Sequence, residues 1–275
     1  MLTTDQMAQY NRDGFVIVEH LFDEEETDLL LKIASADDSL GQPAKDVEKI
    51  DVTRKFGATV ISLGDGQGGE SKFWVDDDIG DDYYSAITRC RRVVDGIEQI
   101  LDGEAYHWHH KVMLKSARTG GAFMWHQDFG YWHKVGHCLF PFMASCMIAV
   151  NPTIKANGCL QVLSGSHQIG LINHERVDGQ ATADPERVAA AVERLPLVHL
   201  ELDPGSAVFF HCNLLHRSDA NRSDDHRWTL ICCYNAARND PYADSHHPRY
   251  TPLNKLEDDQ VLQIGRQQWE GRATS

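Results

Sequence analysis

The chain has 275 residues, 42% of them hydrophobic, which suits one β-rich domain with helical additions around a sizeable core. Its net charge of -15, with no run of Lys or Arg, argues against binding to phosphate backbones or anionic membrane surfaces. The seven cysteines form an odd count without Cys-x-x-Cys spacing, so we expect reduced, buried thiols and neither a disulfide framework nor a thiolate metal site.

The first elements follow a helix, strand, helix pattern. Residues 4–12 have helical spacing, and Asp13-Gly14 ends that helix before the β-branched run at 15–18. Asp23 is a suitable cap for a second helix, because acidic residues fill the first turn and apolar residues follow. We therefore expect a short strand with one helix before it and one helix after it.

Loops and one long helix are expected in the rest of the N-terminal part. Residues 37–57 are polar and irregular, and residues 64–69 include four glycines, so both segments are predicted to be surface loops. Apolar residues recur near helical spacing from 81 to 101, which predicts one long helix. Residues 1–103 are thus predicted to form a helical part packed on a core.

The character changes after Gly103, where short β-rich segments dominate. They lie at 106–114, 123–128, 144–150, 159–162, 197–202, 207–211 and 228–234. Such a series predicts a mainly β protein with an antiparallel jelly-roll (double-stranded β-helix, cupin-like) core over 104–240. Asp184-Pro185 begins a helix that ends near Leu195, within an insertion at about 170–196. Residues 241–275 are a C-terminal extension, and the whole of 1–275 is predicted to be one domain.

No signal for export or membrane insertion is visible. The N-terminus lacks a charged region followed by an apolar one, and no run of about 18 apolar residues occurs. We expect a cytoplasmic protein.

A candidate metal site combines two separated motifs. His126 and Asp128 stand at i and i+2 in a predicted strand, which places both side chains on one face, and His216 follows the apolar strand 207–211. Two His and one carboxylate on one octahedral face are the ligand set of non-haem Fe(II) oxygenases. In the alternative interpretation, the two histidines are hydrogen-bonded core residues and Asp128 is a turn residue. That alternative leaves Arg227 unexplained.

Arg227 opens a predicted strand, where an inward-facing guanidinium requires an anion. Arginine matches a carboxylate with two parallel hydrogen bonds, so it suits the distal end of 2-oxoglutarate, and Ser218 can donate a hydroxyl to the same group. The alternative is a surface ion pair of Arg227 with Asp224 or Asp225.

At these residues the chain resembles the phytanoyl-CoA dioxygenase family of Fe(II)- and 2-oxoglutarate-dependent oxygenases. The likeness includes the opening residues 9–16, the His126/Asp128/His216 triad, the motifs at 157–160 and 164–167, and Arg227 at the family spacing. It implies a double-stranded β-helix, iron at the triad and 2-oxoglutarate on Arg227. It also implies that the glycines of both motifs shape turns and that His167 is a packing residue.

Within that family the chain is most similar to ectoine hydroxylases, around 126–133, 212–216 and 234–236. The resemblance implies that Trp132 contacts substrate and that Phe123 and Ser218 contact the co-substrate. The chain departs from the pattern at three positions, where His109, Met113 and Thr229 replace a substrate-binding glutamine, a co-substrate asparagine and an asparagine two residues after the arginine. His109 and Thr229 are retained as candidates for substrate and co-substrate contact.

The implied reaction is hydroxylation of an unactivated C–H bond, with Fe(2+), 2-oxoglutarate and O2, succinate and CO2 as by-products, and ascorbate as a candidate reductant. The Asp128 carboxylate favours hydroxylation over halogenation, because related halogenases leave that position to chloride. Tyr131 and Trp132 are suited to an aromatic wall for a cationic or zwitterionic ligand. We expect a small polar metabolite, such as a compatible solute, an amino acid derivative or an aminophosphonate, as substrate of a monomer or homodimer.

Two alternative functions stay open from the sequence. One is a non-oxygenase, cupin-like metal protein, which the triad suits as well. The other is a tailoring oxygenase that acts on a larger natural-product scaffold, and the volume of the pocket distinguishes it from a small-metabolite enzyme. The histidines at 107–110 and 133–137 lie near the predicted site, either as ligands of an anionic group or as bystanders.

Overall fold

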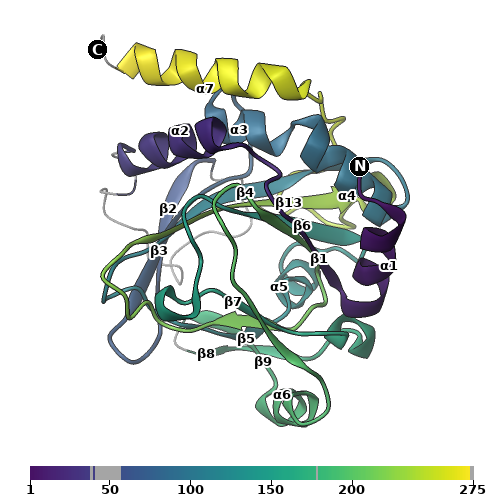
Figure 1. Cartoon of the computed structure of the whole chain (residues 1–275). Helices are drawn as coiled ribbons and strands as arrows, with labels where there is room; N and C mark the ends of the chain where they lie inside the picture. The colour runs from purple at the N-terminus through teal and green to yellow at the C-terminus, as the bar shows by residue number, and fades with distance from the viewer. Residues whose placement is uncertain (38–39, 41–56, 178, 273–275) are drawn as a thin grey trace.

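The computed structural model describes residues 1–37, 40, 57–177 and 179–272. Two antiparallel sheets face one another in a jelly roll, and helices cover the outer face of the larger sheet (Figure 1). The expected mainly β, jelly-roll architecture is therefore confirmed. Most of the predicted loop at 37–57 lies outside the described residues.

The larger sheet has seven strands, all paired antiparallel. In spatial order they are β1 (Phe15–Val18), β11 (Ala207–His211), β6 (Met143–Ala149), β13 (Arg227–Ala236), β4 (Ala105–Lys115), β3 (Glu70–Asp76) and β2 (Thr59–Gly64). The smaller sheet contains β10 (Leu197–Leu200), β7 (Leu160–Leu163), β12 (His216–Ser218) and β5 (Phe123–His126). A separate hairpin joins β8 (His174–Val177) to β9 (Gln180–Ala183).

Seven α-helices lie within the described residues. They are α1 (Thr4–Asp13), α2 (Glu24–Ser35), α3 (Tyr83–Thr88), α4 (Arg91–Leu101), α5 (Asp128–Lys134), α6 (Pro185–Val192) and α7 (Asp258–Arg272). Short 3-10 turns occur at η3 (Lys155–Asn157), η4 (Ser166–Ile169) and η5 (Ala237–Asn239). None of the described helices combines the length and apolar content needed to cross a membrane.

Alternation along the strands divides the apolar side chains between two cores. In β11, Ala207 and Phe209 belong to the core under the helices, whereas Val208 and Phe210 belong to the core between the two sheets. Successive side chains of a strand point to opposite faces, so one strand supplies both cores. The larger sheet is consequently buried on both faces, and the interior of the roll is enclosed.

Local signals at the N-terminus predicted the first elements correctly. Thr3 and Asp23 cap α1 and α2 through capping boxes, and Gly14 ends α1 in the left-handed conformation at φ 82°. Strand β1 then follows and pairs with β11. The predicted cap Asp184 and the proline at the first position of α6 are also confirmed.

The predicted single helix over 81–101 is wrong, because the structure has two helices there. Cys90 adopts an extended backbone between α3 and α4 and forms an isolated bridge with Leu256. Arg91 N–H donates to the Leu256 carbonyl at 3.0 Å, and Leu256 N–H donates to the Arg89 carbonyl at 2.9 Å. These bonds to a distant segment replace the helical ones at the break.

The N-terminal part is also less helical than expected. Strands β2 and β3 form a hairpin that extends the larger sheet, because β3 pairs with β4. The glycine-rich segment after Gly64 is the turn of that hairpin. The insertion likewise contains the β8–β9 hairpin in addition to α6. In the C-terminal extension, α7 packs against α2 and α3.

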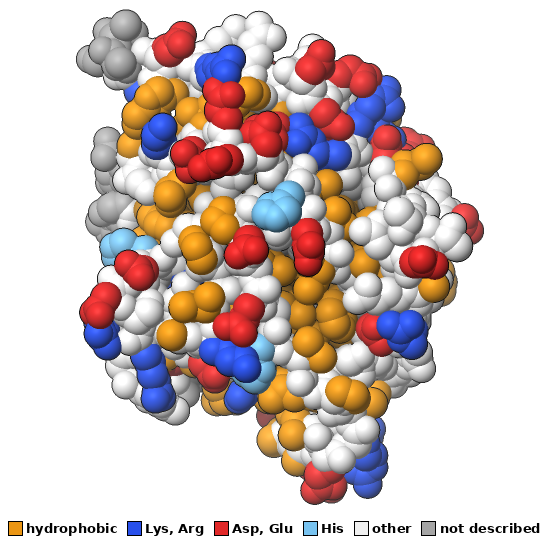
Figure 2. Space-filling model, in the orientation of Figure 1, with side chains coloured by type: hydrophobic (Ala, Val, Ile, Leu, Met, Phe, Trp, Pro, Cys, Tyr) orange, Lys and Arg blue, Asp and Glu red, His pale blue; other side chains and the backbone are white. Residues whose placement is uncertain are grey.

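The distribution of surface charge and the state of the cysteines agree with what the composition predicts. On the face shown in Figure 2, Lys and Arg are interspersed with Asp and Glu and do not gather in one basic patch. All seven cysteines are free and buried, as predicted.

Candidate active site

The two histidines of the predicted triad lie next to each other on adjacent strands of the smaller sheet. His126 ends β5 and lies opposite His216 of β12, with the ring centroids 4.1 Å apart. Asp128 lies beside them, and its Oδ1 is 3.9 Å from His216 Nε2. The donor atoms of the three residues all lie within 4.8 Å of one another.

The predicted backbone around Asp128 is wrong, although its placement beside the histidines is as expected. Strand β5 ends at His126, and Asp128 opens α5. Phe129 N–H donates to the Cys212 carbonyl at 3.0 Å, which ties the start of this helix to the segment before β12. Asp128 is therefore brought to the site by a strand-to-helix turn.

Both imidazoles are oriented by the backbone. His126 Nδ1 lies 2.7 Å from the Met124 carbonyl, and His216 Nδ1 lies 2.9 Å from the Leu214 carbonyl. A proton on Nδ1 that is donated to a carbonyl leaves Nε2 free as the ligand atom, which is the usual arrangement of metal-binding histidines. Burial and the neighbouring His216 lower the pKa of His126 to about 3, so this imidazole is neutral at pH 7. The donor set fits a divalent metal on one octahedral face.

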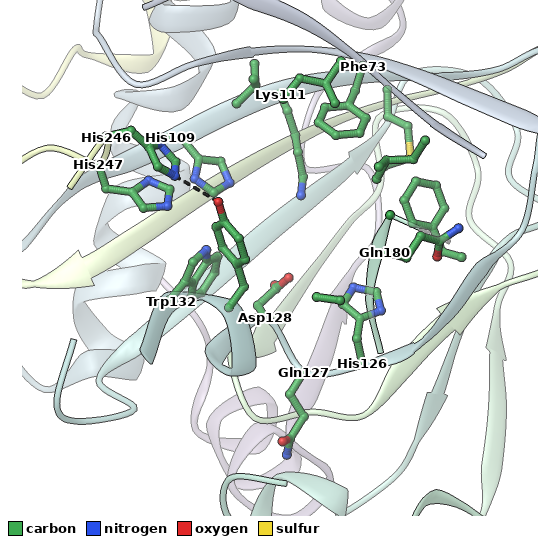
Figure 3. A pocket seen from close by; sticks show the side chains of 18 of the residues that line it. Phe73, His109, Lys111, His126, Gln127, Asp128, Trp132, Gln180, His246 and His247 are labelled. Atoms are coloured by element: carbon green, nitrogen blue, oxygen red, sulfur yellow. Dashed lines mark hydrogen bonds between the residues drawn. The ribbon is translucent and has the colours of Figure 1, made fainter. Parts of the chain in front are cut away.

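Gln127, between the two ligands, has a structural role. Its side chain points away from the cavity (Figure 3). The amide donates to the carbonyls of Gly170 and Asn213, both at 2.8 Å, and accepts from Ile172 N–H at 2.8 Å. These bonds fix the turn between His126 and Asp128 to two neighbouring segments.

Arg227 lies inside the roll, only 2% exposed, and the alternative surface ion pair does not form. Asp224 pairs with Arg118 instead, at 2.6 Å. The Arg227 guanidinium donates to the Gly158 carbonyl and to Met113 Sδ, and its Nε has no hydrogen-bond partner among the described residues. Burial lowers the pKa of Arg227 to about 10. A buried guanidinium with an unpaired N–H is suited to an anionic ligand.

Gly158 shapes the turn that presents its carbonyl to Arg227. It has φ 76°, in the left-handed region, and a Cβ there would lie 2.2 Å from the Asp219 carbonyl oxygen. Only glycine fits this turn without moving the backbone.

One small cavity, of about 60 Å³, borders both the triad and Arg227. Phe123 and Ser218 also line it, as expected for co-substrate contacts. Thr229 borders neither this cavity nor the larger one described below, and its buried hydroxyl has no hydrogen-bond partner among the described residues.

The sequence interpretation missed Lys115, at the end of β4. Its fully buried ammonium donates to Ser218 Oγ at 2.7 Å and to the Asp219 carbonyl at 2.5 Å, and it lies 5.3 Å from the centre of the Phe123 ring. Burial and the nearby Arg227 hold its pKa well below the usual value. The available signal was a lysine at the end of an apolar strand. Arg227 thus borders the small cavity directly, while Lys115 lies behind Ser218, which lines it.

A larger cavity, of about 200 Å³, opens on the other side of His126 and Asp128. The three predicted substrate contacts, Tyr131, Trp132 and His109, all line it. The Trp132 ring meets the His109 ring edge-on at 5.9 Å. Sequence reasoning missed further polar residues of its wall, among them Asp77, Lys111, Arg176, His246 and His247.

The other histidines of the predicted cluster border neither cavity. His107 and His110 contact one another through ring nitrogens 3.0 Å apart, and His133 Nδ1 lies 2.8 Å from the Cys138 carbonyl. His167 packs against the ring of His211 at 5.4 Å.

The fold and the site together define a jelly-roll protein with a candidate metal centre and an enclosed anion site. The phytanoyl-CoA dioxygenase family matches residues 10–229, and the chain belongs to this family. The expected class, a 2-oxoglutarate-dependent dioxygenase, is confirmed.

Individual relatives agree with that assignment. The chain is 27% identical over 249 residues to an ectoine dioxygenase of Bordetella parapertussis, which covers 86% of this chain and 77% of the relative. It is 28% identical over 176 residues to an L-proline trans-4-hydroxylase of Streptomyces griseoviridis, covering 58% of this chain and 66% of that protein. The crystal structure of EctD from S. alaskensis with bound Fe superposes with a TM-score of 0.73 at 23% identity, covering 93% of this chain and 88% of EctD. EctD has also been solved with 2-oxoglutarate and 5-hydroxyectoine.

Proposed function

We propose that the protein hydroxylates an unactivated C–H bond of a small polar metabolite, with Fe(II) held by His126, Asp128 and His216. 2-Oxoglutarate occupies the smaller cavity, and the substrate occupies the larger one. The observation that carries this proposal is that one 60 Å³ cavity touches both the triad and the buried guanidinium of Arg227. A keto acid that chelates the metal at one end reaches a cation at the other.

The co-substrate end is built from groups that need an anion. The guanidinium of Arg227 keeps an unpaired N–H inside the roll, and Ser218 is held by the buried ammonium of Lys115. A carboxylate there satisfies the guanidinium through two parallel hydrogen bonds and accepts from the Ser218 hydroxyl. Phe123 closes the side of this cavity with an apolar ring. Thr229 borders neither cavity, so any effect it has on 2-oxoglutarate is indirect, through neighbouring residues of β13.

The metal end is supported by its donor chemistry. Two imidazoles and a carboxylate leave the remaining positions of an octahedral ion open. Bound iron with 2-oxoglutarate and O2 would supply the oxidation that places a hydroxyl on carbon while succinate and CO2 are released. The chain's own residues orient the ligands: backbone carbonyls fix both imidazoles, and Ser145 Oγ lies 3.3 Å from Asp128 Oδ2. The walls around the metal site exclude water from the reacting centre.

The larger cavity bears on substrate size. Its volume of about 200 Å³ is below the roughly 300–1,000 Å³ that is typical of sites for drug-sized ligands. This volume favours a small metabolite, such as a compatible solute, an amino acid derivative or an aminophosphonate, over a larger natural-product scaffold. The buried Arg227 likewise favours the oxygenase over a non-oxygenase, cupin-like metal protein, which has no use for that cation.

The test is substrate-stimulated release of succinate. Purified protein is supplied with Fe(II), 2-oxoglutarate, O2 and ascorbate, and a panel of small polar metabolites is screened for succinate formation and for oxygen from ¹⁸O2 in the product. We expect some panel members to raise succinate release and to gain one labelled oxygen atom. The variant His216→Ala removes both signals, whereas His199→Ala, on β10 and outside both cavities, retains them. Absence of 2-oxoglutarate turnover in the iron-loaded wild type contradicts the proposal.

A further inference from the structure

The larger cavity has a second polar end, remote from His126. Asp77 follows β3, His109 lies in β4, and His246 and His247 come from the segment after η5. In Figure 3 the three histidines gather on one side of the cavity, opposite His126, and Lys111 reaches in between the two groups. All of the cluster is buried, with Asp77 only 2% exposed.

Asp77 is a buried carboxylate without hydrogen-bond donors. Among the described residues neither of its oxygens accepts a hydrogen bond, and the closest imidazole nitrogens are His246 Nδ1 at 3.5 Å and His247 Nδ1 at 3.7 Å. Burial acts to raise the pKa of Asp77, but the two imidazoles outweigh burial and lower it. Asp77 is therefore ionised inside the cavity, and its oxygens remain available to N–H donors of a ligand.

The imidazoles of His109 and His247 are neutral and have unused nitrogens. Burial holds the pKa of His109 well below its usual value and lowers that of His247 to about 4. His109 Nδ1 and both ring nitrogens of His247 have no hydrogen-bond partner among the described residues. The cluster therefore offers hydrogen-bond acceptors to a ligand that carries several N–H donors.

Lys111 supplies an opposite charge in the same cavity. It lies two residues after His109 on β4, hence on the same face of the strand, and it lines both cavities. Its ammonium lies 5.9 Å from the centre of the Phe73 ring, and within the described residues it forms no ion pair with any carboxylate, Asp77 included. Asp77 and Lys111 thus carry opposite charges in the same cavity and do not pair with each other.

We propose that this end of the cavity binds the protonated amino group of a zwitterionic substrate. Asp77 and the neutral imidazoles of His109 and His247 accept hydrogen bonds from the nitrogen, while Lys111 binds the acidic group. The inference rests on the proposed function, because it assigns the substrate class of that site. The acceptors call for N–H donors, so a primary or secondary ammonium fits better than a quaternary one, which prefers an aromatic cage.

A second metal ion is the competing occupant of this cluster. The donor atoms of Asp77, His109 and His247 lie within 4.8 Å of one another. However, the His109 and His247 rings are stacked, with their centroids 5.4 Å apart and an angle of 23° between their planes. Lys111 in the same cavity repels a divalent cation, whereas it attracts the acidic group of a zwitterionic ligand.

The test uses matched compounds on the Fe(II)-loaded protein with 2-oxoglutarate. The panel contains ω-amino acids and aminoalkylphosphonates of two to four carbons, each with its desamino and N-acetyl counterpart. Binding is measured without oxygen by calorimetry, and coupled succinate release is measured with oxygen. We expect at least one amino compound to bind the wild type at least about 30-fold more tightly than its counterparts, since loss of one partner of a buried charge pair costs 2–5 kcal/mol.

Two variants test which residue recognises the amino group and which recognises the acidic group. Asp77→Asn lowers the affinity for the amino compound to that for its desamino counterpart and leaves the desamino affinity and the KM for 2-oxoglutarate unchanged. Lys111→Met has the complementary effect, on the acidic group. Asp78→Asn, which changes an exposed carboxylate one residue away, retains wild-type selectivity.

Several outcomes overturn the inference. These are equal binding of amino and desamino compounds by the wild type, no binding of any panel member, an equal loss of both affinities in Asp77→Asn, or a second equivalent of metal that Asp77→Asn removes. The wild-type comparison needs no variant, so it holds even if Asp77→Asn fails to fold. Turnover of 2-oxoglutarate without substrate, measured first, separates failure of this inference from failure of the proposed function.

Discussion

Replacing Arg227 with methionine tests the smaller cavity as the 2-oxoglutarate site. Methionine keeps much of the side-chain volume but removes the charge and the paired donors. Each hydrogen bond to a charged group contributes about 1.5–3 kcal/mol, so losing a bidentate contact with the distal carboxylate costs roughly 3–4 kcal/mol. We expect the KM for 2-oxoglutarate to rise roughly 100-fold to 1,000-fold, with iron content unchanged.

The same substitution should not destabilise the protein in the absence of 2-oxoglutarate. Burial lowers the pKa of Arg227 from 12.5 to about 10, which corresponds to a cost of about 3 kcal/mol for the cationic form. Because the folded pKa lies below the unfolded one, this cost is fully present at pH values below about 10 and is relieved only above it. Loss of the bonds to Gly158 and Met113 offsets part of the gain. We expect a Tm equal to that of the wild type or about 2–5 °C higher.

The measurements are 2-oxoglutarate titrations of succinate release and thermal unfolding with and without 2-oxoglutarate. The wild type should gain thermal stability from the co-substrate, and Arg227→Met should not. Arg222→Met, an exposed arginine nearby, serves as the matched control and keeps both properties. A KM for 2-oxoglutarate within about threefold of the wild type, or a large fall in Tm without ligand, refutes the reasoning and makes Arg227 a structural anchor.

Three further predictions concern the triad, Lys115 and the thiols. In Asp128→Ala the iron content should fall at least about tenfold and coupled turnover should be lost, as measured by metal analysis and succinate release; wild-type rates contradict the site assignment. Lys115→Met frees the Ser218 hydroxyl, so we expect about a tenfold higher KM for 2-oxoglutarate with unchanged iron content, and an unaltered KM shows that Lys115 does not position Ser218. Burial raises the pKa of thiols such as Cys212, so Ellman's reagent at pH 7.5 should modify the native protein far more slowly than the unfolded chain, and rapid native labelling contradicts that burial.

Sequence reasoning succeeded where the determining interactions are local. The predicted caps Asp23 and Asp184 lie within three residues of the groups they bind, and Gly14 ends α1 through its own backbone. Short β-rich segments likewise identified the central strands of the roll. These features depend on spacing that is written in the chain itself.

It failed where a distant segment decides the local structure. The break at Cys90 is made by Leu256, and β2 and β3 are strands because β4 offers them an edge. Asp128 shows an intermediate case: its position two residues after His126 brought it to the right place, although a turn into α5 and not a strand carries it there.

The residues that sequence reasoning missed share one physical property. Asp77, Lys111 and Lys115 are charged side chains in or beside β3 and β4, and no local pattern distinguishes them from solvated surface charges. Only the packed structure shows that Asp77 and Lys115 are buried and that Lys111 faces a cavity.

Burial of unpaired charge is itself the argument for ligands at these positions. Arg227 borders the smaller cavity, Lys115 is buried behind Ser218 of the same cavity, and Asp77 borders the larger one; neither cation pairs with Asp77. Burial lowers the pKa of both cations, so each of them costs free energy in a fold whose total stability is only about 5–15 kcal/mol. Apolar residues of similar size would make the same roll more stable, so the arrangement is best explained by ligands that supply the missing partners. A dicarboxylic co-substrate meets the cations and an ammonium meets the carboxylate, which places the two ligands on either side of His126 and Asp128.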